Sequence, residues 1–141
     1  LNDQLMVEDQ LMDIKDLRQT AIKFLENNGD GTCTYCEGSK DAKSSDNPTK
    51  AVISLSNDGK TSYKMYLAVQ NELVAAYNFL RDRECKKRYG ISFSELDYIF
   101  NDPASKGKYK EKEIEEFGEK VKVIQELFPQ RLSEAEPKKS N

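Results

Sequence analysis

The chain has 141 residues, with 22 Lys or Arg against 25 Asp or Glu, so its formal net charge is −3. A chain of this length suits one domain and buries roughly two-thirds of its unfolded surface, so it needs no metal or disulfide to fold. A weakly acidic chain lacks the clustered cations that bind phosphates, and we therefore expect no nucleic-acid partner. The sequence contains no His, which excludes His-based catalysis and most zinc sites.

The N-terminal part predicts a hairpin followed by a helix. Residues 1–12 read as a short hairpin because polar turn residues flank an apolar run. Asp13 suits the N-cap of a helix, and 27–29, Asn-Asn-Gly, suits its end. The polar, turn-rich segment 29–50 predicts a mobile loop. The apolar stripe of the helix consists of Ile14, Leu17, Ala21, Ile22, Phe24 and Leu25.

A strand and a long helix follow the loop. Residues 51–55 predict the strand, since β-branched side chains stand between polar boundaries. Thr61 or Ser62 is expected to cap the next helix, which we expect to extend to about Lys87. Its stripe consists of Tyr66, Val69, Leu73, Ala76, Tyr77 and Leu80.

Residues 91–128 predict a helical insert made of two helices. Ser92 and Glu95 match a capping box at the start of the first helix. The second is expected over 110–128 and ends at Pro129. Gly118 weakens that helix by roughly 1 kcal/mol relative to Ala. The expected apolar positions are Phe93, Leu96, Ile99 and Phe100, then Ile114, Phe117, Val121, Ile124 and Phe128.

Together these elements predict an α+β fold in a single domain over 1–141. Its centre is a small mixed β-sheet with two main amphipathic helices on one face, and the helical insert is added to it. Residues 131–134 predict the last strand, and 135–141 predict a disordered tail. A sheet of few, short strands has exposed edges that pair with other chains. We therefore expect a partner strand to add beside one of two strands. One is the last strand, with Arg131, Leu132, Ser133 and Glu134 as partner-contacting residues, and the other is the strand 51–55.

Cys33 and Cys36 form a CxxC motif, which has three interpretations. A thioredoxin-type pair needs a strand before it and a helix after it, but this motif lies in a polar loop. A zinc site needs further ligands, and only Cys85 remains. The favoured interpretation is a local disulfide in an oxidising compartment, or two free thiols. No catalytic, cofactor-binding or metal-binding residue is predicted.

Four segments, 5–17, 52–58, 66–73 and 128–137, resemble in sequence and order the periplasmic domain of the ExbD/TolR family of biopolymer-transport proteins, most closely an ExbD-type branch. The resemblance does not extend well over the loop 29–50 or the insert.

The resemblance implies an inner-membrane protein with one membrane helix, of which this chain is the periplasmic part. Because the chain begins at Leu1 rather than Met, we expect it to be a piece of a longer protein. The family couples proton flow to outer-membrane uptake together with an ExbB-type channel subunit and a TonB-type partner. Its proton-carrying Asp lies in the membrane helix, outside this chain. The implied role is dimerisation and partner docking, without enzymatic activity or cofactors.

Two alternatives to this role stay open. A TolR-like protein of the same family would bind peptidoglycan and serve envelope integrity. A thiol–disulfide enzyme would use Cys33 and Cys36.

Overall fold

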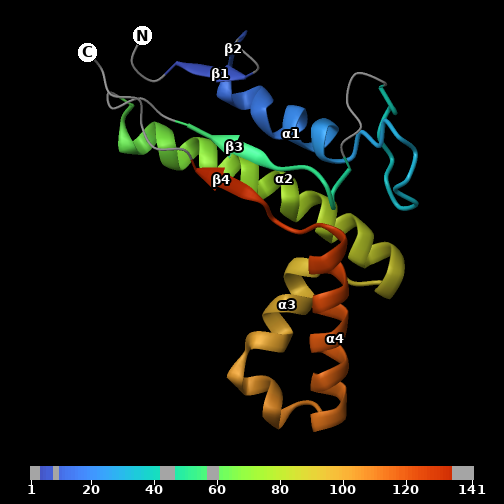
Figure 1. Cartoon of the computed structure of the whole chain (residues 1–141). Coiled ribbons are helices and arrows are strands. Elements are labelled where there is room, and N and C mark those ends of the chain that lie inside the picture. The colour runs from blue at the N-terminus through green and yellow to red at the C-terminus, as the bar shows by residue number, and fades with distance from the viewer. Residues whose placement is uncertain (1–3, 8–9, 42–46, 57–60, 135–141) are drawn as a thin grey trace. The chain divides into compact units, whose positions relative to one another are not determined.

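The computed structural model describes residues 4–7, 10–41, 47–56 and 61–134. Its contacts divide the chain into two compact units. The first unit comprises 1–76 with 130–141, and the second comprises 77–129 (Figure 1). The predicted tail, 135–141, and the part of the predicted mobile loop at 42–46 lie outside the described residues.

The strands of the first unit form two separate pairs. β1 (Leu5–Val7) and β2 (Gln10–Met12) form an antiparallel hairpin, as predicted. β3 (Ile53–Leu55) and β4 (Leu132–Glu134) pair in parallel, and both predicted strands are confirmed with shorter bounds. The α+β class is confirmed, but the expected single sheet is replaced by two two-stranded sheets. Residues of β1 and β3 line the same apolar hollow, so in the described part of the chain no backbone ladder joins the two pairs.

The first helix begins and ends close to the residues that the sequence indicates. Asp13 accepts a hydrogen bond from the backbone N–H of Lys15 at 3.2 Å, which caps the short 3-10 helix η1 (Ile14–Asp16). α1 (Leu17–Leu25) follows directly. Its C-cap is Glu26, just before the predicted end at 27–29, and Asn28 in that segment adopts a left-handed φ of 57°.

α2 (Tyr63–Tyr89) is the longest helix and runs through both units. Ser62 is its cap, since its Oγ accepts a hydrogen bond from the N–H of Met65 at 3.1 Å. Gly90 ends it with a φ of 76°. The predicted stripe is confirmed by burial: Val69, Leu73, Ala76, Tyr77 and Leu80 are buried and Tyr66 is half-buried.

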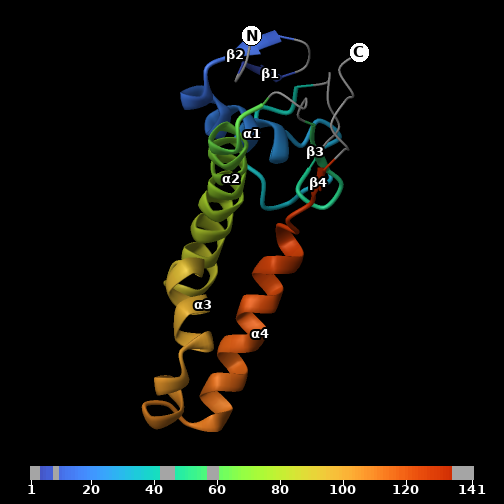
Figure 2. The same ribbon diagram turned by 90° about the vertical axis from the view of Figure 1, so that its left-hand side faces the viewer.

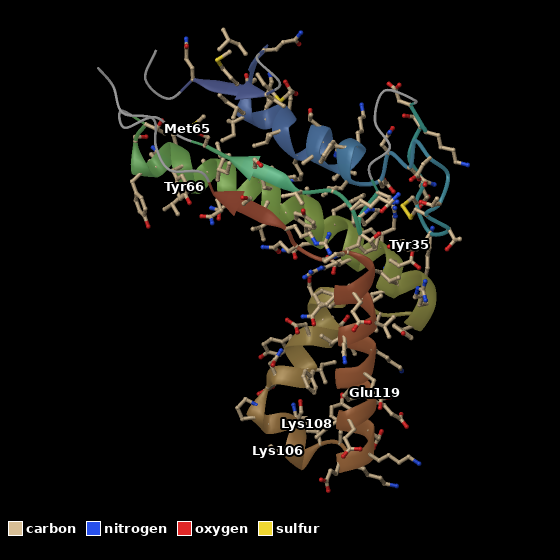
Figure 3. All side chains as sticks on the ribbon, viewed as in Figure 1. Tyr35, Met65, Tyr66, Lys106, Lys108 and Glu119 are labelled. Carbon is tan, nitrogen blue, oxygen red and sulfur yellow. A yellow bond between two sulfur atoms is a disulfide. The ribbon has the colours of Figure 1, made fainter. Side chains whose placement is uncertain are left out.

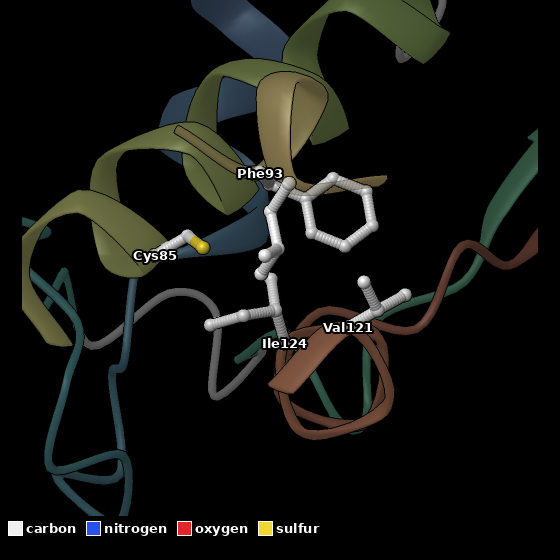
Figure 4. Packing of buried hydrophobic residues seen from close by; sticks show 5 residues of the cluster. Cys85, Phe93, Val121 and Ile124 are labelled. Atoms are coloured by element: carbon white, nitrogen blue, oxygen red, sulfur yellow. The ribbon is translucent and has the colours of Figure 1, made fainter. Parts of the chain in front are cut away.

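The second unit is helical and has its own core. α3 (Phe93–Asn101) and α4 (Glu111–Leu127) lie side by side, joined through the 3-10 helix η2 (Pro103–Gly107) (Figure 2). Ser92 caps α3 by accepting from the N–H of Glu95 at 3.2 Å. Figure 4 shows the core, which consists of Cys85, Phe93, Leu96, Val121 and Ile124.

Arg81 ties the end of α4 to α2. Its Nε and Nη2 donate to the carbonyl oxygen of Phe128 at 3.0 and 2.8 Å. Its guanidinium carbon lies 5.3 Å from the ring centre of Phe93, within the range of a cation–π contact. Burial lowers the pKa of Arg81 from its ordinary value. The last carbonyls of a helix have no partner within it, so this bidentate contact fixes where α4 ends.

The burial of Leu73 gives a direct test of the α2 stripe. Its side chain is 3% exposed, so we expect Leu73→Ala to lower the free energy of unfolding by about 2–5 kcal/mol. Urea unfolding followed by circular dichroism measures this. Asn71→Ala, on the exposed face of α2, is the matched control and should change stability by less than about 0.5 kcal/mol. Equal values for the two variants would contradict the assignment.

Candidate functional site

An apolar groove in the first unit lies between β1 and β3. Its volume is about 450 Å³, and its walls are Leu5–Val7 of β1 and residues 52–55. Phe24 of α1, with Val69 and Leu73 of α2, also lines it. All of these residues belong to the first unit. We call this hollow the β1–β3 groove.

The backbone of β3 presents one edge to β4 and the other to the groove. The N–H of Ile53 donates to the carbonyl of Arg131 at 3.0 Å, so the polar backbone groups of Ile53 face β4. Backbone groups of successive residues in a strand point to opposite edges, so those of Ser54 point away from β4. Ser54 also lines the β1–β3 groove. In the described part of the chain, no strand pairs with β3 along this second edge.

The side chains of the two walls match an extended ligand. Leu5, Val7, Ile53 and Leu55 are half-buried and apolar. Val52, at the entrance to β3, is 49% exposed. A strand inserted between β1 and β3 would cover these side chains and place every second side chain against the helices.

An ion pair between α1 and α2 holds the helical side of the groove in place. Arg18 Nε donates to Glu72 Oε2 at 2.7 Å, and Arg18 Nη2 donates to Glu72 Oε1 at 3.3 Å. A bidentate contact of this kind fixes direction as well as distance. Both side chains are partly exposed, so the pair contributes more to geometry than to stability.

The residues predicted to bind a partner lie in and beside β4. Arg131 precedes the strand, and its Nη1 donates to the carbonyl of Thr49. Leu132, Ser133 and Glu134 pair with Ile53, Ser54 and Leu55 of β3. One edge of β4 is therefore already used, and the apolar groove borders β3 rather than β4. The sequence predicted an open sheet edge, but it did not indicate which strand borders an apolar groove.

The CxxC motif is a disulfide, with the Cys33 and Cys36 Cα atoms 5.7 Å apart. This agrees with the favoured interpretation, a local disulfide. Buried Asn28 clamps the same loop: its Oδ1 accepts from the N–H of Cys33 and its Nδ2 donates to the carbonyl of Cys33, both at 2.9 Å. The half-buried Tyr35 lies within this loop, between the two cysteines, and is labelled in Figure 3.

A second asparagine and an ion pair secure the rest of the described loop. Buried Asn27 accepts from the N–H of Asp41 at 3.0 Å and donates to its carbonyl at 2.9 Å. Asp30 pairs with Lys50 at 2.6 Å and also accepts from Thr32. The Lys50 hydrogen bond, then those from Thr32, hold the pKa of Asp30 well below its usual range.

The surroundings of the disulfide do not match a thioredoxin-type site. From Gly29 to Asp41 the described backbone contains no helix, so no helix N-terminus is there to stabilise a thiolate at Cys36. Cys85, the remaining cysteine, is a buried thiol of the second unit, and its burial raises its pKa. Among the residues that the structure describes, no group of acidic or cysteine side chains could hold a metal ion.

Comparisons with known proteins do not identify a relative. No protein-family model, curated protein or solved structure matches the chain. None of the helices in the described ranges is both long and apolar enough to span a membrane.

The disulfide closes a very short loop, which limits its contribution to stability. We expect the double variant Cys33→Ser/Cys36→Ser to lose about 2 kcal/mol of unfolding free energy, the chain-entropy value for a loop this short. Chemical denaturation of both proteins measures the difference. Because the Asn28 clamp does not involve sulfur, the amide spectrum outside 29–41 should not change. Thr34→Ala, within the same loop, is the control, and global unfolding of the serine variant would contradict the prediction.

Proposed function

We propose that this chain is the periplasmic domain of an inner-membrane, ExbD-type component of a proton-driven, TonB-linked transport complex. It acts without catalysis, by dimerising and by docking a strand of its partner in the β1–β3 groove. The observation that carries the proposal is the edge of β3 at Ser54, which faces away from β4 and borders an apolar groove. An edge of this kind accepts an extended peptide.

The order of elements supports the proposal. A hairpin, a helix, a strand, a second helix and a last strand follow one another along the chain, interrupted by the helices of the second unit. The four segments that resemble the ExbD/TolR family, 5–17, 52–58, 66–73 and 128–137, coincide with β1 to η1, β3, the first half of α2, and β4. Under this proposal, the ExbB-type subunit contacts a membrane helix outside this chain.

Strand docking suits a protein that transmits force. A partner strand beside β3 is held by a row of backbone hydrogen bonds, and each contributes roughly 0.5–1.5 kcal/mol net. The apolar side chains of Leu5, Val7, Ile53 and Leu55 add burial to these bonds. A force along the strand is shared by all of these hydrogen bonds at once. A single side-chain contact would have to bear the whole force and would break sooner.

Titration of the 15N-labelled protein with a synthetic peptide from the periplasmic region of a TonB-type protein tests the proposal. We expect the largest amide shifts at residues 5–7 and 52–55. Ser54→Pro removes the N–H that faces the groove and should raise the peptide Kd at least about tenfold.

Glu134→Pro is the matched control, since the alternation of β4 against β3 places the N–H of Glu134 on the outer edge of β4. It should leave the Kd unchanged. If the peptide changes the amide shifts of the helices of the unmodified protein and leaves those of β3 unchanged, strand docking in the groove is refuted. Loss of binding only in Glu134→Pro would place the partner on β4, the other of the two strands that the sequence predicted as docking edges.

A further inference from the structure

We propose that the second unit carries a separate docking groove, on α4, for a cationic amphipathic segment of a partner. A hollow of about 820 Å³ lies over the start of α4. Its apolar lining comes from Phe100, Tyr109 and Ile114. All of its residues belong to the second unit, so it is distinct from the β1–β3 groove. We call it the α4 groove.

Gly118 shapes the α4 groove. A Cβ atom at this position would lie 2.7 Å from Cε1 of Phe100, so the ring packs directly against the helix backbone. Phe100 nevertheless remains 38% exposed. The opposite end is held by Tyr109, whose ring meets that of Phe117 edge to face at 5.1 Å. The groove is therefore bounded by aromatic rings that have fixed neighbours.

The charges along the groove are arranged differently from those on the neighbouring face of α4. Glu111, Glu115 and Glu119 follow one another at four-residue intervals, and all three line the groove. Carboxylates at this spacing on a helix repel one another. The adjacent stripe alternates instead, with Lys112, Glu116 and Lys120 at the same spacing.

None of the three groove carboxylates forms an ion pair with a described cation. Ion pairs of the second unit join Arg88 to Glu84 and Lys122 to Glu126, away from these three carboxylates. Two lysines, Lys106 and Lys122, also border the groove, and Figure 3 shows Lys106 on η2 and Glu119 on α4. The lining of the groove thus holds the three carboxylates of this acidic stripe against two lysines, beside its apolar residues.

This arrangement defines the occupant. A helix with Lys or Arg four residues apart matches the spacing of Glu111, Glu115 and Glu119. One large apolar side chain on the same face would enter between Phe100 and Ile114. Partner cations would remove the repulsion within the acidic stripe, which gives the segment its charge preference.

The test uses the whole chain and a fluorescein-labelled, helix-forming synthetic peptide with lysines four residues apart and one phenylalanine on the same face. Fluorescence anisotropy should show binding that weakens with salt. Glu115→Gln/Glu119→Gln should raise the Kd about fourfold, since each exposed ion pair contributes a factor of roughly two. The control Glu95→Gln/Glu116→Gln removes the same charge from the second unit outside the groove and should leave the Kd within about twofold.

Three results would overturn the proposal. Equal weakening by both double variants would indicate bulk charge attraction. Amide shifts of the unmodified protein outside residues 100–122 would place the peptide elsewhere. Unchanged affinity after replacement of the peptide phenylalanine by alanine would show that the apolar hollow is not used. The peptide with glutamates in place of its lysines should not bind.

Discussion

Backbone hydrogen bonding by very short strands constrains the first unit more than any other interaction. Each strand has three residues, so a strand in a two-stranded sheet satisfies only the polar groups on one of its edges. The groups on the other edge of β3 point toward an apolar groove. A buried polar group without a partner costs about 1–3 kcal/mol, so this edge favours water or another strand over apolar cover. The proposed docking of a partner strand in the β1–β3 groove rests on this constraint.

The second unit depends on a different interaction, the packing of side chains between helices. Ile124 and Leu96 lie in its core, and Arg81 holds the end of α4 through the carbonyl of Phe128. With its main chain paired within helices, this unit has no open sheet edge among its described residues. Its surface can therefore be specific only through side chains, and the acidic stripe of α4 beside Phe100 is the clearest such feature.

The sequence predicted the local structure better than the sites. Ser62 and Ser92 cap their helices as predicted, because capping depends on neighbours within a few residues. The sequence did not predict that β3 pairs with β4. The paired residues are about 80 positions apart, and a strand of three residues has too few side chains for its alternation to specify a partner strand. The sequence predicted only that Gly118 weakens its helix. In the structure, the missing side chain at Gly118 leaves room for the ring of Phe100. Such a close approach between helices leaves no local signature in the sequence.

The two proposed contacts differ in the chemical groups that would recognise a partner. This difference would allow one chain to bind two partners independently. A strand at the edge of β3 is recognised mainly through its main chain, which every sequence has, so specificity there rests on the apolar side chains of Leu5 and Ile53. A segment on α4 is recognised through charge, which is screened beyond about 8 Å at physiological ionic strength. Salt would therefore weaken the second contact while leaving the first nearly unchanged. Different salt responses would therefore distinguish the two proposed contacts in one protein.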